Sequence, residues 1–287
     1  MAIEKLHVCG ERFLPSVDWL TATRGKGYDP AGDCHFTTSL NRYLASLSNP
    51  ADAQRWAFMG FYGWSQAKAA WGSSHDRYIV RAHGEAANMA WFSACKYANR
   101  VSCLDLAVTF WPTNRGDDLA AIVAEKVLEC RDAGEVRKEK KVALISGFGD
   151  GDTLYIGSRK SQTFARLYDK SAQSSAGEFR GAWRAELELK DDRALAVARK
   201  LVASEEPYTL IASYVYSFFL KHGVDFQWEG THAADLPSTY TTRDPSVERL
   251  MLWLSRDVKP AVLRAVRAEG RDAVLAVLGV DKKVESQ

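Results

Sequence analysis

The sequence predicts an α+β fold, in which helices pack on a central antiparallel or mixed sheet and a helical appendage follows at the C-terminal end. Two observations lead to this prediction. Four strand-like runs with short connections follow one another between residues 142 and 189, an order typical of an antiparallel meander. Segments with apolar residues at helical spacing lie before and after this region, at residues 85–97, 117–130, 193–203 and 207–222.

The remaining elements run from a strand-rich first half to a helical end. Strands are expected first at residues 17–21, 55–64, 77–81 and 101–110. The strands of the meander are expected at residues 142–145, 153–156, 164–168 and 183–189. Asp244 and Pro245 form a helix start, and short helices are expected at 247–254, 260–268 and 272–278. We therefore expect one domain over residues 1–235 and a helical tail over residues 236–287.

The composition limits the classes of protein that are possible. Of the 287 residues, 46% are hydrophobic and 26% are charged, so the chain can bury a core. The net charge is only +2, so a nucleic-acid-binding protein of this composition has to gather its basic residues locally. No segment approaches the roughly 20 apolar residues of a membrane span, and the first residues lack the apolar core of a signal peptide. Five cysteines without a C-x-x-C pair favour reduced thiols, so we expect a cytoplasmic protein with no membrane partner.

Several motifs of nucleotide and metal sites are absent. The sequence contains no G-x-x-x-x-G-K-[ST] phosphate loop, no His-hydrophobic-His pair and no H-E-x-x-H helix. The glycine-rich segment 147–152 lies between two predicted strands, so a hairpin turn is expected there. His83 stands alone near a strand end, where we expect a structural role. Tyr214 and Tyr216 are two residues apart on a predicted helix, so they face different directions and are poor candidates for a cooperating pair.

Three of the predicted strands carry polar side chains at alternate positions. Because alternate residues of a strand share one face, each of these strands presents a polar face. The side chains on these faces are Asp105, Ala107 and Thr109 on one strand, Arg166, Tyr168 and Lys170 on the next, and Arg184, Glu186, Glu188 and Lys190 on the last. Lys170 belongs to its face only if the strand persists to that residue.

These faces carry groups suited to the cleavage of a phosphodiester bond. A tyrosine hydroxyl has a pKa of about 10 and is a weak nucleophile at neutral pH. Arg166 and Lys170 would favour the tyrosine anion and bind the phosphate, and carboxylates from two strands could hold a divalent metal ion that polarises a phosphate oxygen. The simpler alternative is the solvated face of an antiparallel sheet, with Tyr168 as an exposed cross-strand partner. Spacing alone favours this alternative.

Three segments resemble the trans-acting rolling-circle replication initiators, also called the replication initiation factor family. They are residues 104–108, 157–170 and 184–189, and the second is the most specific of them. Residues 17–20 and 247–254 also fit, so the resemblance extends over most of the chain in the expected order. The family includes plasmid initiators, filamentous-phage initiators and relaxases of some conjugative elements. It implies an HUH-like nicking domain that lacks the His-hydrophobic-His motif.

The resemblance implies a role for each residue at a matching position. Tyr168 is the implied nucleophile, and Asp105 and Glu186, with Glu188 as a further candidate, are the implied ligands of a Mg²⁺ or Mn²⁺ ion. The sequence departs from the family at Thr109, where members commonly have a second acidic residue. The implied reaction is a nick in one strand at an origin hairpin whose DNA is single-stranded at the nick. Tyr168 becomes linked to the 5′ phosphate, and the free 3′ hydroxyl primes synthesis.

Further basic residues are candidates for contact with DNA phosphates. They are Arg159, Lys160 and Arg184 in the central segment, Lys140 and Lys141 in the basic run 137–141, and Arg264 and Arg267 in the tail. For the basic run and the tail, an ordinary solvated surface is an equally good interpretation. The resemblance also implies a homodimer, a host helicase as a partner and a bacterial host.

Two alternatives to a replication initiator stay open. A conjugative relaxase would use the same residues and the same chemistry on a different DNA site. A DNA-binding regulator would keep the fold without cleaving DNA, and Thr109 is the feature that favours it.

Overall fold

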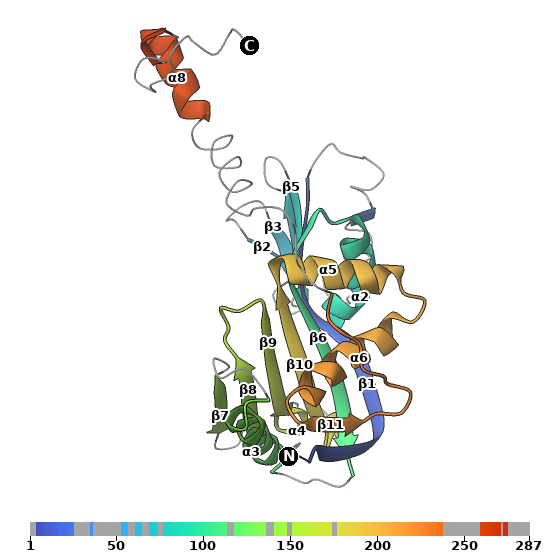
Figure 1. Ribbon diagram of the computed structural model, residues 1–287. Helices are drawn as coiled ribbons and strands as arrows, with labels where there is room; N and C mark the ends of the chain where they lie inside the picture. Colours follow the sequence, from blue (N-terminus) through green and yellow to red (C-terminus); the bar gives the residue numbers. More distant parts are fainter. Residues whose placement is uncertain are drawn as a thin grey trace. The chain divides into compact units, whose positions relative to one another are not determined.

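Figure 1 shows the computed structural model of the chain, which divides into two compact units, Met1–Thr239 and Tyr240–Gln287. The structure describes residues 4–25, 35–36, 53–56, 61–64, 69–73, 77–113, 118–135, 141–147, 151–173, 177–237, 259–270 and 272–274.

The described strands of the first unit form one sheet of 11 strands. They are β1 (Leu6–Gly25), β2 (Ala53–Trp56), β3 (Phe61–Trp64), β4 (Ala69–Ser73), β5 (Arg77–His83), β6 (Arg100–Pro112), β7 (Val142–Gly147), β8 (Gly151–Gly157), β9 (Thr163–Asp169), β10 (Trp183–Lys190) and β11 (Val224–Gln227). Ten strands follow one another in the order β2-β3-β4-β5-β1-β6-β10-β9-β8-β7, and each neighbouring pair is antiparallel. β11 pairs with the beginning of β1 in parallel.

Helices cover one face of this sheet (Figure 1). They are α2 (Glu85–Tyr97), α3 (Leu119–Asp132), α5 (Asp191–Ala203) and α6 (Pro207–Leu220). α2 packs against β1 and β5, α3 against β7 and β8, and both α5 and α6 against β6. The short helix α4 (Lys170–Gln173) and a 3₁₀ turn at Gly177–Phe179 lie between β9 and β10. Within the described ranges, no helix is long and apolar enough to cross a membrane.

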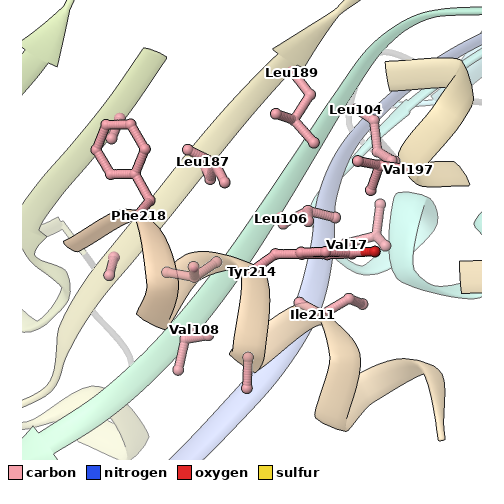
Figure 2. Packing of buried hydrophobic residues seen from close by; sticks show 14 of the residues in the cluster. Val17, Leu104, Leu106, Val108, Leu187, Leu189, Val197, Ile211, Tyr214 and Phe218 are labelled. Atoms are coloured by element: carbon pink, nitrogen blue, oxygen red, sulfur yellow. The ribbon is translucent and has the colours of Figure 1, made fainter. Parts of the chain in front are cut away.

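The core lies between the helices and one face of the sheet. The strand residues that do not enter the core lie on the opposite face. Figure 2 shows the side chains of the core, among them Leu104, Leu106, Val108, Leu187 and Leu189 from β6 and β10, and Val197, Ile211, Tyr214 and Phe218 from α5 and α6. Because successive side chains of a strand point to opposite faces, Asp105 and Glu186 lie on the face without these helices. A register slip of one residue would bury these carboxylates in the apolar core, so the core fixes the position of the polar face.

The second unit contains helix α8 (Lys259–Glu269) among its described residues. This helix confirms the one predicted at residues 260–268. Residues 272–274 are also helical. The predicted helix at residues 247–254 and the helix start at Asp244 and Pro245 lie outside the described residues.

The structure confirms the α+β fold class and the antiparallel meander, but three details of the sequence prediction are wrong. The first strand is expected over residues 17–21, whereas β1 has 20 residues, because it pairs in turn with β11, β6 and β5. The single strand predicted at residues 55–64 is instead the antiparallel pair β2 and β3.

The third detail concerns Lys170, which is predicted to continue the strand of Arg166 and Tyr168. β9 ends at Asp169, and Lys170 begins α4. The Asp169 carboxylate accepts hydrogen bonds from the backbone N–H groups of Ser171 (2.8 Å) and Ala172 (3.2 Å). These bonds satisfy donors at the start of the helix, so the chain turns immediately after the strand.

Candidate active site

The structure brings five of the predicted site residues to one cavity of about 500 Å³. They are Asp105 from β6, Arg166 and Tyr168 from β9, and Glu186 and Glu188 from β10. The strand pairing explains how they meet, since Arg166 lies opposite Glu186 and Glu188 lies opposite Asp105. Side chains that are opposite on neighbouring strands stand on the same face of the sheet, within reach of one another.

Arg166 forms the centre of this cluster. Its Nη2 lies 2.9 Å from Asp105 Oδ2 and 2.6 Å from Glu186 Oε2, so one nitrogen joins two carboxylates from different strands. Both carboxylates are buried, with 4% of Asp105 and 1% of Glu186 exposed. Burial raises the pKa of Asp105 to about 7, although the Arg166 guanidinium acts to lower it. Burial also raises the pKa of Glu186, again against the effect of Arg166.

Tyr168 lies beside this pair, and only 7% of its surface is exposed. Its hydroxyl donates a hydrogen bond of 2.5 Å to Glu186 Oε1. Burial raises the pKa of Tyr168, and the negative charge of Glu186 raises it further. The positive charge of Arg184 acts to lower this pKa, but it does not outweigh burial and Glu186. Lys170 is close, with its Nζ 5.9 Å from the centre of the Tyr168 ring.

A second arginine, Arg184, lies beside the cluster and contacts Asp18 and Thr109. Its Nη1 lies 2.6 Å from Asp18 Oδ1, and its Nε donates a hydrogen bond of 2.9 Å to Thr109 Oγ1. Thr109 thus supplies a hydroxyl acceptor, while Asp18 supplies a carboxylate from β1. Asp18 lines the same cavity. It sits at a β-bulge, where the pairing of β1 with β6 passes from Val17 directly to Trp19.

Sequence reasoning missed Asp18 and two aromatic residues of the cavity wall. Trp19 and His83 line the cavity, and their rings are stacked with centroids 5.0 Å apart. His83 is expected from the sequence to be structural, whereas the structure places it at the cavity through its pairing with Trp19. The available signal was an acidic residue between the apolar residues Val17 and Trp19, at Asp18.

The predicted metal ligands Asp105, Glu186 and Glu188 all carry carboxylate oxygens. Carboxylate oxygens are the donors that Mg²⁺ and Mn²⁺ prefer, so the chemistry of the set is suitable. Within the described residues, however, no group of three or more His, Cys, Asp or Glu side chains is arranged to hold a metal ion. Arg166 lies between Asp105 and Glu186, and Glu188 forms an ion pair of 2.8 Å with Lys190. As the side chains lie, the set does not fit a divalent ion.

The predicted DNA-binding residues are spread over several parts of the structure. Arg159 and Lys160 are exposed in the turn between β8 and β9, and Lys141 is exposed at the start of β7. Arg264 and Arg267 are exposed on α8 in the second unit. Arg184 is largely buried by its contacts with Asp18 and Thr109. Lys140 lies outside the described residues.

Comparison with known proteins agrees with this fold. A family model described as replication initiation factor matches residues 117–275. A solved structure described as a rolling circle replication initiator protein from Geobacillus stearothermophilus matches with a TM-score of 0.50 and 20% sequence identity. The match covers 70% of this chain and 83% of that chain, and at this identity it shows the fold. No curated protein matches the sequence.

Proposed function

Because the chain belongs to the replication initiation factor family, we propose that it nicks and rejoins one strand of DNA at an origin of rolling-circle replication. In this proposal Tyr168 is the nucleophile, and the intermediate is a tyrosine linked to the 5′ phosphate. The protein is then a site-specific DNA endonuclease and strand transferase. Its substrate is DNA that is single-stranded at the nick.

The observation that carries the proposal is the hydrogen bond of 2.5 Å from the Tyr168 hydroxyl to Glu186. A nucleophile that is hydrogen-bonded directly to a base is one of the arrangements that activate a side chain for covalent catalysis. When the tyrosine oxygen attacks the phosphorus, its proton passes to Glu186 Oε1. The bond from phosphorus to the 3′ oxygen breaks, and that oxygen leaves as a hydroxyl after taking a proton from solvent. Rejoining reverses these steps, and the phosphotyrosine keeps the bond energy, so no nucleotide cofactor is needed.

Cations of the cavity support phosphate binding. Arg166 Nε is buried and, within the described part of the chain, has no hydrogen-bond partner. A buried donor without a partner is costly, and a phosphate oxygen in the cavity would supply the missing acceptor. Lys170, close to the Tyr168 ring, adds positive charge beside the nucleophile.

Assistance by Mg²⁺ or Mn²⁺ is a separate part of the proposal, which comes from the family resemblance. The resemblance assigns Asp105, Glu186 and Glu188 to such an ion, and these carboxylates would bind it only if Arg166 and Lys190 released them. Because Arg166 holds two of these carboxylates, the proposed steps involve only groups of the protein, and the nicking assay with and without a metal ion measures whether an ion assists them.

The test is a nicking assay on supercoiled DNA that carries the candidate origin, with Mg²⁺, with Mn²⁺ and with a chelator. The proposal predicts conversion to the open-circular form by the wild type and none by Tyr168→Phe, which removes only the hydroxyl. DNA binding without cleavage under every condition would contradict the proposal. The chain would then be a DNA-binding regulator, an alternative that the raised pKa of Tyr168, caused by its burial and by Glu186, favours.

A further inference from the structure

The turn between β8 and β9 carries an arginine that lies beside two aromatic rings, outside the cluster around Tyr168. The guanidinium carbon of Arg159 is 5.6 Å from the centre of the Tyr155 ring and 5.7 Å from the centre of the Phe164 ring. The two rings are themselves stacked, with centroids 5.6 Å apart and an angle of 16° between their planes. The guanidinium carbon is therefore about equally far from the two rings, and the three side chains form one group.

The outer side of this group is accessible. Arg159 is exposed, whereas Phe164 beside it is buried. Among the described residues, the guanidinium of Arg159 makes no hydrogen bond or ion pair, and its contacts are the two rings. The backbone carbonyl of Arg159 accepts a hydrogen bond from Lys190 Nζ, which ties the turn to β10. The guanidinium is thus held in place while its N–H groups are available to a ligand.

The group adjoins the cavity of Tyr168. Tyr155 lines that cavity and lies opposite Arg166 in the pairing of β8 with β9. Phe164 and Tyr168 are four residues apart on one strand and share its face, at a separation of about 13 Å. A strand of DNA whose phosphate reaches Tyr168 would therefore bring a neighbouring nucleotide, and not the reacting one, to Arg159.

We infer that Arg159, supported by Tyr155 and Phe164, is a stacking platform for an unpaired base of single-stranded DNA at this site. Bases stack on arginine planes and on aromatic rings, and such contacts are largely independent of base identity. The free edge of the guanidinium can at the same time bind a phosphate oxygen. The inference rests on the proposed function, since it names how the same site holds the strand that Tyr168 cuts.

The experiment compares binding of two fluorescent oligonucleotides of equal length in a metal-free buffer, one of thymidines and one whose sugars carry no bases. Both have the same phosphates, so the ratio of their dissociation constants measures the contribution of the bases. Arg159→Lys keeps the charge and removes the plane. Lys160→Ala, at the exposed neighbouring position, is the matched control because it removes a charge and leaves the platform intact.

The wild type should bind the thymidine oligonucleotide more tightly than the abasic one. Arg159→Lys should reduce this preference by roughly five- to a hundredfold, the range expected when one base no longer stacks. Lys160→Ala should weaken binding of both oligonucleotides alike and leave the preference unchanged. An unchanged preference in Arg159→Lys, or equal binding of both oligonucleotides by the wild type, would overturn the inference.

The two levels of the proposal fail in different ways. If the wild type binds both oligonucleotides equally but still forms a covalent adduct with DNA, only the stacking platform is wrong. If it forms no adduct and binds neither oligonucleotide, the proposed function is wrong and the platform with it.

Discussion

The charge balance of the cavity predicts that Asp105→Asn makes the protein more stable above neutral pH. Asp105 is 4% exposed, and its carboxylate contacts Arg166 at 2.9 Å. Burial nevertheless raises its pKa from 3.8 to about 7, because the favourable effect of Arg166 does not compensate for lost hydration and for the charges of Glu188 and Glu186. The ionised form of this side chain therefore destabilises the folded protein.

The direction and size of the effect follow from linkage between protonation and folding. Between about pH 4 and pH 7 the folded protein keeps a proton on Asp105 that the unfolded chain has released. The stability contributed by this proton is complete below the unfolded pKa and is lost as the pH rises through the folded pKa. A shift of about three pKa units at roughly 1.4 kcal/mol each corresponds to a loss on the order of 4 kcal/mol. Asparagine is neutral at every pH and avoids this loss.

Urea denaturation of the wild type and of Asp105→Asn at pH 5 and pH 8 measures the effect. The variant should have the larger free energy of unfolding at both pH values, and the difference should be larger at pH 8, because only part of the loss has occurred at pH 5. Asp132→Asn, at an exposed position on α3, is the control and should not change the pH dependence. A variant that is less stable than the wild type at pH 8 would refute the reasoning, because the ion pair with Arg166 would then outweigh the burial of the charge.

Three further predictions test other parts of the account. Glu186→Gln removes the proton acceptor of the nucleophile, so nicking should fall by about 10²–10⁴-fold while duplex binding, measured by fluorescence anisotropy, is kept. Replacing Lys140 and Lys141 with alanine should lower the slope of log affinity against log salt by about 0.9 for each phosphate that the protein no longer neutralises, and an unchanged slope would assign them to a solvated surface. Gly223→Ala should cost roughly 2–4 kcal/mol in urea denaturation, because φ is +83° and a Cβ would clash with a cysteine of α3. Gly177→Ala, where a Cβ meets nothing within 4 Å, should be nearly neutral.

The positions of the central site residues were predictable because apolar and polar residues alternate regularly along β6, β9 and β10. A period of two assigns Asp105, Tyr168 and Glu186 to one face as soon as the apolar residues are assigned to the core. The pairing of these strands then brings the side chains together. This part of the site needs only local sequence patterns and an antiparallel arrangement.

The rest of the site depends on features that such a pattern does not contain. Asp18 reaches the cavity through a β-bulge, and a bulge changes the phase of the alternation without a clear sequence signal. Lys170 lies outside the strand because the Asp169 carboxylate accepts hydrogen bonds from the first backbone N–H groups of α4. These bonds compete with continuation of the strand. Arg166 binds two carboxylates because the side chains of Asp105 and Glu186 are buried beside it on neighbouring strands. The alternation along β9 alone does not contain this information.

The most direct test of the central claim is to identify the residue that becomes joined to DNA. The protein is incubated with a single-stranded oligonucleotide of the origin in the presence of Mn²⁺, digested with a protease, and analysed by mass spectrometry. The account predicts a nucleotide adduct on the peptide that contains Tyr168, and no adduct in Tyr168→Phe, whose melting curve should show that it is folded. An adduct on another tyrosine, or an adduct that persists in Tyr168→Phe, would contradict the account.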